Sequence, residues 1–312
     1  MAAPTARVTT RVTTQQRTLG ISADLFAATL WGFTGIIVTY SKTAPFVLTF
    51  YRLWISAALM LVALLLRRRT LSWRVVVRAA PSGVLLGANL ACYVFAFRLT
   101  TIADASVIGA LQPALVLIGA ALLFQEQVGL REVLLTAVAI AGVCGVVTDK
   151  GISIGAHGKG DLIAVIGTLA FTGYWLFAKQ ARSGIPTFEF MAGVWIAAAV
   201  ALTPVALASG ESFTAIPARN WPWIVALAIV PGVGHLMVNW AHRFVDASVS
   251  SVITILNAPV AAIAALVILR QLLSAVQIAC GSVAVVAIAL VARGRRTRAG
   301  NVAEPVGTEG EQ

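Results

Sequence analysis

Two side-chain amides lie near the middle of long apolar segments and could bind a polar ligand there. Gln112 belongs to the segment 105–126, and Asn257 occupies the matching place 145 residues later in the segment 249–269. Small or polar residues recur with each amide at helical spacing, so each amide shares one helix face with them. Because an amide in contact with lipid would have no hydrogen-bond partner, both faces are expected to face protein or water.

A proline close to each amide is expected to interrupt the helix at the same depth. Pro113 and Pro259 each remove one backbone hydrogen bond, which leaves the carbonyl groups of Gly109 and Ile255 without their usual donors. Polar backbone of this kind is tolerated inside a membrane where it lines a cavity. The paired prolines therefore predict a binding cavity near the middle of the membrane.

Arg52 is a charged residue well inside the apolar segment 46–66. A guanidinium at that depth is costly unless it is paired or close to water. Its planar set of donors fits a carboxylate, whereas an anchoring role would direct it to a helix end. Both roles, a structural anchor and a ligand for a substrate carboxylate, are consistent with the sequence.

Two further segments combine a proline with polar residues on one helix face. His235 and Asn239 are four residues apart and follow Pro231 in one segment. Asn89 and Tyr93, also four residues apart, follow Pro81 in another. Interrupted helices at mid-depth are typical of transporter binding sites, so we predict a helix break at each proline. Ordinary packing of these side chains is the alternative.

The predicted cavity lies between the first, third, fourth, sixth, eighth and ninth apolar segments. Trp31 and Trp175 lie well inside two of these segments. The sequence is equally consistent with these side chains lining the cavity or packing in the core. The predicted substrate-binding residues are Trp31, Arg52, Asn89, Tyr93, Gln112, Trp175, His235, Asn239 and Asn257.

Coupling to protons has two candidates, Glu126 and His235. Every Asp and Glu, including Asp24, is predicted to lie at the edge of a span or in a loop, which argues against coupling through a buried carboxylate. Transport without protons is equally consistent with this pattern.

Catalytic, cofactor and metal sites are not predicted. The segment 155–160 lacks the spacing and the hydroxyl residue of a phosphate-binding loop, and no catalytic constellation shares one membrane depth. The three cysteines, Cys92, Cys144 and Cys280, have unrelated spacings within apolar segments and are expected to pack in the protein.

The composition indicates an all-α integral membrane protein. Of 312 residues, 59% are hydrophobic and 11% are charged, while soluble domains carry about 25% charged residues. Ten apolar segments are long enough to be transmembrane helices: 25–41, 46–66, 80–97, 105–124, 133–148, 162–178, 190–208, 221–240, 249–269 and 273–292. The net charge of +11 is explained by topology rather than by nucleic-acid binding.

The distribution of positive charge predicts that both termini are cytoplasmic. With that orientation, 16 Lys and Arg residues lie in cytoplasmic segments and six lie on the other side. The first 20 residues lack the features of a cleavable signal peptide. We expect a multi-pass protein of the cytoplasmic membrane that contacts membrane lipids as a monomer or a homodimer.

The two halves of the chain repeat one another. Asp24, the triplet 33–35 and Lys42 recur as Asp161, the triplet 171–173 and Lys179. Since each copy has five spans, the second copy would enter the membrane in the opposite direction, as an inverted repeat. The predicted segments are a polar leader (1–20), the first repeat (21–150), an extracytoplasmic loop (151–160), the second repeat (161–292) and a disordered cytoplasmic tail (293–312).

The chain resembles the EamA family of the drug/metabolite transporter superfamily between about residues 25 and 292. The shared features are Trp31-Gly32, Arg52 after Pro45, Pro113 with Glu126 at the end of its span, and Pro259. Span nine closes with Arg270-Gln271, where this family usually repeats the glutamate. The resemblance implies a secondary carrier of small metabolites such as amino acids, often an exporter.

Two other functions are consistent with the same topology. A lipid-linked or sugar-phosphate translocator would require two or more positive charges at mid-depth, and Arg52 supplies one. A membrane scaffold without transport activity would explain the hydrophobicity but not the amides and prolines inside the spans.

Overall fold

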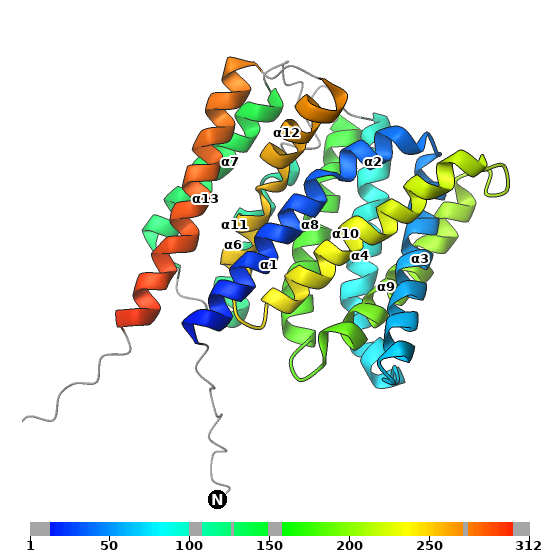
Figure 1. Ribbon diagram of the computed structural model, residues 1–312, viewed down its shortest axis with the longest axis horizontal. Coiled ribbons are helices and arrows are strands. Elements are labelled where there is room, and N and C mark those ends of the chain that lie inside the picture. Colours follow the sequence, from blue (N-terminus) through cyan, green and yellow to red (C-terminus); the bar gives the residue numbers. More distant parts are fainter. Residues whose placement is uncertain (1–12, 100–107, 126–127, 149–157, 271–273, 302–312) are drawn as a thin grey trace, which may run out of the picture.

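The computed structural model describes residues 13–99, 108–125, 128–148, 158–270 and 274–301, and no strand occurs among them (Figure 1). The first helices are α1 (Thr14–Gly32), α2 (Thr34–Ser41), α3 (Pro45–Leu66), α4 (Trp73–Leu99), α6 (Gln112–Phe124) and α7 (Leu130–Thr148). They are followed by α8 (Gly158–Ala181), α9 (Thr187–Ala208), the 3-10 turn η1 (Ala218–Asn220), α10 (Trp221–Ala241), α11 (Ala247–Thr254), α12 (Asn257–Leu269) and α13 (Ala275–Asn301).

The helices form a multi-pass membrane bundle. Seven segments are long and apolar enough to cross a membrane: Thr14–Val38, Pro45–Leu66, Trp73–Tyr93, Gly158–Ala181, Thr187–Ala208, Ala218–Ala241 and Ala247–Ile268. Two shorter helical segments, Gln112–Phe124 and Ile278–Val291, are also apolar. Large apolar side chains lie on the outside, among them Leu66, Leu122 and Val267 with exposed fractions of 81%, 77% and 70%. The all-helical membrane fold is confirmed, whereas the total of ten crossings stays a prediction.

Helix interruptions occur beside both central amides, as predicted. A turn at Ala110 and Leu111 precedes α6, and a turn at Ile255 and Leu256 separates α11 from α12. A further turn at Phe33 separates α1 from α2. The prediction of breaks at Pro81 and Pro231 is wrong, because α4 and α10 continue through both prolines. Each of these long helices can lose one backbone bond while its neighbours hold it in place.

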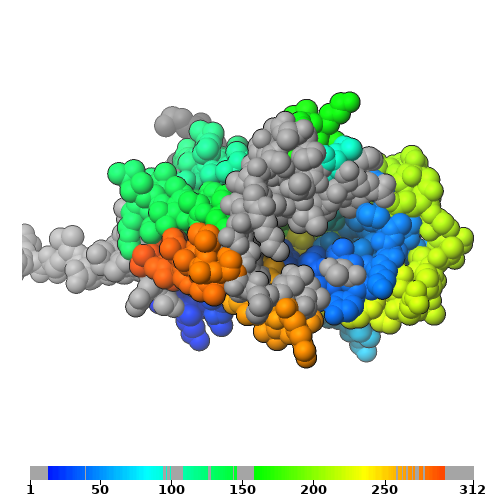
Figure 2. All heavy atoms as spheres, turned by 90° about the horizontal axis from the view of Figure 1, so that it is seen from above, coloured from blue at the N-terminus to red at the C-terminus, as the bar shows by residue number. Residues whose placement is uncertain are grey.

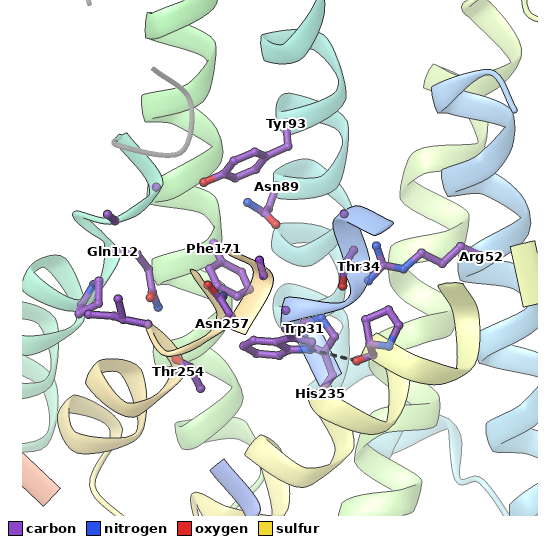
Figure 3. Close-up of a pocket in the computed structure, with 18 residues that line it drawn as sticks. Trp31, Thr34, Arg52, Asn89, Tyr93, Gln112, Phe171, His235, Thr254 and Asn257 are labelled. Carbon is purple, nitrogen blue, oxygen red and sulfur yellow. Dashed lines mark hydrogen bonds between the residues drawn. The ribbon is translucent and has the colours of Figure 1, made fainter. Parts of the chain in front are cut away.

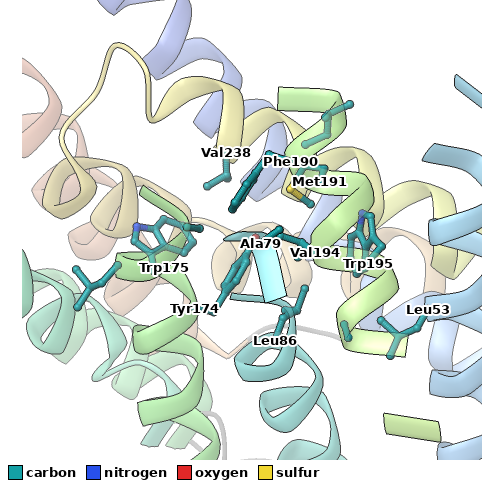
Figure 4. Packing of buried hydrophobic residues seen from close by; sticks show 14 of the residues in the cluster. Leu53, Ala79, Leu86, Tyr174, Trp175, Phe190, Met191, Val194, Trp195 and Val238 are labelled. Carbon is teal, nitrogen blue, oxygen red and sulfur yellow. The ribbon is translucent and has the colours of Figure 1, made fainter. Parts of the chain in front are cut away.

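Close packing of α4 between α8 and α9 forms the centre of the bundle (Figure 4). Trp175, Phe190 and Trp195 are almost completely buried there, together with Leu86 of α4. The backbones of α4 and α9 approach closely at Gly83, where an added Cβ would lie 2.5 Å from the Val194 carbonyl oxygen. Helices inside lipid gain little from the hydrophobic effect when they associate. Small residues at such contacts let the backbones approach closely, and the resulting van der Waals packing holds the helices together.

The two ends of the bundle are distinguished by the course of the chain. The beginning of α1 and the end of α13 lie at the lower end in Figure 1, where the connection from α8 to α9 also lies. Seen from above, α7 and α13 lie on one side, and α2 lies on the other side with the connection from α9 to α10 (Figure 2). We use "lower end" for the end at which α1 begins.

The first helix starts earlier than the hydrophobic pattern predicted. Thr13 and Gln16 form a reciprocal capping box, so α1 begins at Thr14 and includes part of the polar stretch before residue 20. Asp24 therefore lies inside the span Thr14–Val38, and its assignment to a span edge is wrong. At the other end of the chain, α13 continues to Asn301, past the predicted start of a disordered tail at 293.

We expect Gly83→Val to destabilise the protein, because its side chain would overlap the α9 backbone. Overpacking of this kind costs about 1–3 kcal/mol. Thermal unfolding in detergent, followed by tryptophan fluorescence, measures the change. Gly158→Ala is the matched control, since an added Cβ at Gly158 would have no atom within 4 Å. Equal unfolding temperatures for both variants would contradict the close contact between α4 and α9.

Candidate functional site

A cavity of about 500 Å³ lies inside the bundle where the interrupted helices meet (Figure 3). Its walls come from α1 and α2, α3, α4, the start of α6, α8, α10, and the junction of α11 with α12. The turns beside both amides reach it, since Ala110 and Ile255 are among the lining residues. The cavity therefore lies where the paired prolines predicted polar backbone.

Seven of the nine predicted residues line this cavity: Trp31, Arg52, Asn89, Tyr93, Gln112, His235 and Asn257. Trp175 and Asn239 do not line it, contrary to the predicted lining, because both are completely buried between helices. Trp175 Nε1 donates to the Ala247 carbonyl oxygen at 3.3 Å, at the start of α11. Arg52 also adds the second span to the predicted walls.

Aromatic rings close the lower side of the cavity. The Trp31 indole packs 4.7 Å from the His235 ring and 6.3 Å from the rings of Phe171 and Trp175, measured between centroids. Trp31 Nε1 donates to the Pro231 carbonyl oxygen at 3.1 Å. An added Cβ at Gly234 would lie 2.5 Å from this nitrogen, so the glycine provides the space for the indole. We call Trp31, Phe171, Trp175 and His235 the aromatic floor.

His235 is held from below by a buried polar network. Asn239 Nδ2 donates to the Tyr174 hydroxyl oxygen at 2.8 Å and to the His235 carbonyl oxygen at 2.9 Å. The Tyr174 hydroxyl lies 3.3 Å from His235 Nδ1. Because this hydroxyl already accepts from Asn239, it can donate its hydrogen to Nδ1, which assigns the other imidazole nitrogen as the protonated one. Asn239 thus orients the imidazole without reaching the cavity.

Two polar groups at the cavity lack a hydrogen-bond partner within the described part of the chain. They are Arg52 Nε and Gln112 Nε2, and both residues are buried. Asn89 differs, since its Nδ2 donates to the Gly167 carbonyl oxygen at 2.9 Å and joins α4 to α8. The unused N–H groups of Arg52 and Gln112 are therefore the groups best suited to donate hydrogen bonds to a polar ligand.

The structure adds three polar or aromatic lining residues that the prediction omitted. Thr34 and Phe171 belong to the Phe-Thr-Gly triplets that the two halves share, and Thr254 ends α11 three residues before Asn257. The repeated triplet was thus a signal for the cavity as well as for the repeat.

Neither proton-coupling candidate is tested by this geometry. Glu126 lies outside the described residues, while His235 belongs to the aromatic floor. Across the described ranges, no group of three His, Cys, Asp or Glu side chains could hold a metal ion.

A positively charged cluster lies at the lower end of the bundle, beyond the aromatic floor. His242 caps α10, its ring packs 5.1 Å from Trp175, and neither ring nitrogen has a hydrogen-bond partner among the described residues. Burial, together with the charges of Lys179 and Arg182, holds the pKa of His242 well below its usual range. Burial also lowers the pKa of Arg182 to about 10, with a smaller contribution from Arg243. The His242 imidazole is therefore uncharged at neutral pH.

Comparisons with known proteins agree with this architecture. The profile of the EamA-like transporter family matches residues 18–148 and again residues 158–293. A solved structure titled only as the crystal structure of a protein shares 20% identity and superposes with a TM-score of 0.79. That similarity covers 90% of this chain and 98% of the other, and it shows the fold alone. A search of curated proteins found no match.

We expect the stability of the protein to fall as the pH drops below about 7, and His242→Phe to reduce this fall. The unfolded chain binds a proton at the ordinary histidine pKa of about 6.5, whereas the folded chain binds it only at lower pH. The neutral His242 imidazole thus stabilises the fold at a pH above the pKa that histidine has in the unfolded chain. As the pH falls below that value, the free energy of unfolding decreases by at most about 1.4 kcal/mol per pH unit.

Phenylalanine keeps the ring packed against Trp175 and removes two unpaired nitrogen atoms, so the variant is expected to be at least as stable at neutral pH. Unfolding temperatures between about pH 5.5 and 7.5, around the ordinary histidine pKa, measure both effects. Identical slopes for the wild type and the variant would contradict the assignment.

Proposed function

Since the chain belongs to the EamA-like transporter family, we propose that it is a secondary carrier for a small, carboxylate-bearing metabolite. Support for a carrier comes from the two matched segments, the membrane bundle and a cavity at the meeting point of interrupted helices. Binding sites formed by broken helices between repeats are a common design in secondary transporters.

The observation that carries the proposal is the Arg52 guanidinium at the cavity. Arg52 is 8% exposed, and it is the one Lys, Arg, Asp or Glu among the described lining residues. Its Nε has no hydrogen-bond partner within the described ranges. A buried guanidinium with an unused Nε–H donor favours a carboxylate, which accepts hydrogen bonds from a guanidinium and neutralises its charge.

The remaining walls favour a small substrate with an apolar or planar part. The Gln112 and Asn257 amides supply hydrogen bonds, while Trp31 and Phe171 supply an apolar surface. A phosphate group would favour a second positive charge, which the described walls do not supply. An amino acid or another small organic acid therefore suits these walls better than a sugar phosphate.

We propose alternating access by two inverted five-helix repeats, with export from the cytoplasm as the direction. In support, α1 runs upward from the lower end in Figure 1, whereas α8 ends at that end. The interruptions before α6 and between α11 and α12 occupy matching places in the two copies. The excess of positive charge in the segments assigned to the lower end supports a cytoplasmic location for that end.

The proposed topology predicts opposite accessibility for two exposed serines on either side of α9. Ser183 follows α8 and Ser212 follows α9, so one helix separates them along the chain. With the native cysteines replaced, we expect the Ser212→Cys thiol to react with a membrane-impermeant maleimide in intact cells. The Ser183→Cys thiol should react only after the cells are opened. The reverse pattern would contradict the orientation, and equal reactivity would contradict a crossing by α9.

The proposed role of Arg52 predicts that ligands lose affinity when their carboxylate is replaced by a carboxamide. Thermal stabilisation of purified protein by a panel of amino acids and organic acids, each paired with its amide, measures this preference. Arg52→Lys keeps the charge but loses the paired hydrogen bonds, so acid ligands should bind at least about 10-fold more weakly. Arg52→Gln should weaken them further.

Arg74→Lys is the matched control for these variants, because Arg74 is exposed in the first turn of α4. Efflux of a uniformly ¹³C-labelled amino-acid mixture from proteoliposomes, measured by mass spectrometry, tests transport itself. Normal folding and unchanged ligand affinity in both Arg52 variants would assign Arg52 to structural anchoring.

A further inference from the structure

A buried carboxylic acid lies below the aromatic floor, outside the proposed substrate site. Asp24 has no exposed surface, although it lies within the span Thr14–Val38. Asp24 and Trp31 are seven residues apart on α1, so they share one helix face about 10 Å apart. Trp31 contacts the cavity, and Asp24 lies closer to the lower end.

The surroundings of Asp24 do not satisfy its carboxyl group by hydrogen bonding. The side chains that act on it are the Ser250 hydroxyl of α11 and the more distant Lys179 ammonium of α8. Neither Asp24 oxygen atom, nor Ser250 Oγ, has a hydrogen-bond partner of normal geometry among the described residues. The Lys179 ammonium donates instead to the Val245 carbonyl oxygen at 3.5 Å and lies 5.6 Å from the Phe124 ring centre.

These residues belong to the closure of the lower end. Trp175 and Lys179 are one turn apart on α8, and Trp175 is bonded to Ala247, one turn before Ser250 on α11. The Trp31 and Trp175 rings meet edge to face between α1 and α8. Opening a path from the cavity to the lower end would separate these helices and admit water to the Asp24 carboxyl.

Water would change the protonation of such a group. A carboxylate without hydrogen bonds is strongly disfavoured inside a protein in a membrane, and a bound proton removes its charge. In contact with water, the ionised form is stabilised by hydration and by Lys179. Closed and open forms of the lower end should therefore differ in their affinity for a proton.

We propose that Asp24 is a proton-binding site whose occupancy is linked to closure of the lower end. While that end is closed, the Asp24 carboxyl holds a proton; when it opens, the O–H bond breaks and water on that side takes the proton. The inference rests on the proposed carrier function, but the proton site can be tested without a substrate. Asp24, a residue of the first span, would thereby couple proton binding to the opening of the lower end.

Other titratable groups close to this region must be separated from Asp24. α8 contributes Lys179 and is followed by Arg182; α10 is followed by His242 and Arg243; and Asp246 caps α11. α12 has no titratable side chain in its sequence. Histidine is the residue type among these whose ordinary pKa lies closest to neutral pH, so the pH experiment uses a His242→Phe background.

Infrared spectroscopy of the purified carrier tests proton binding directly. We expect the carbonyl stretch of a buried, protonated carboxyl group at pH 7 that disappears in Asp24→Asn. Asp161→Asn is the matched control, since Asp161 is the repeat counterpart at the beginning of α8 and should leave the band in place. Ser250→Ala should shift the band without removing it, which identifies Asp24 even if Asp24→Asn does not fold.

Thiol labelling from the lower end tests the link to closure. Ala28 is completely buried one turn from Asp24, whereas Ser183 is exposed at the same end. In inverted vesicles, the labelling rate of an Ala28→Cys thiol divided by that of a Ser183→Cys thiol cancels the pH dependence of thiol chemistry. We expect this ratio to rise with pH, by up to about tenfold per pH unit, and to be low and constant when Asp24→Asn is added.

A wild-type spectrum without the band, or an unchanged band in Asp24→Asn, would overturn the proton site. An identical pH dependence of labelling with and without Asp24→Asn would overturn its link to closure. Failure of the carrier function has a different signature: the spectroscopic and labelling results would stand, but proteoliposomes would release no labelled compound.

Discussion

The cost of leaving a polar group without a partner inside a membrane determines how this chain places its few polar side chains. Most of the described backbone lies within helices, and the helix interruptions at Ala110 and Ile255 lie at the cavity. The Gln112 and Asn257 amides lie at the same place, with Arg52 across from them. One concentration of polarity in an apolar bundle thus defines where a ligand can be bound.

Close packing on both sides of α4 supports that cavity. The Gly83 contact with α9 and the Asn89 hydrogen bond to α8 join three long, uninterrupted helices. The interruptions before α6 and between α11 and α12, by contrast, belong to the parts of the two copies that carry the central amides. This division suits a carrier, because uninterrupted helices can act as a frame while short helical segments change their positions.

Two buried ionisable groups lie on opposite sides of the aromatic floor. Arg52 faces the cavity above it, whereas Asp24 lies below it with Ser250 and Lys179. Apolar rings between them limit the entry of water and keep the two electrostatic environments separate. The proposed substrate site and the proposed proton site therefore lie on different sides of the floor.

The sequence by itself determined the membrane class, the family, the repeated amides and prolines, and most of the cavity. These features depend on composition and on spacing within one helix, as the seven correct lining residues show. The tertiary structure alone decided the depth of Asp24, because a capping box at Thr13 begins α1 within a polar stretch. It also placed Trp175 in the aromatic floor but outside the cavity lining, and Asn239 below that floor. Helical spacing gives the face on which a side chain lies, but only the neighbouring helices decide whether that face meets a cavity, a hydrogen-bond partner or another ring.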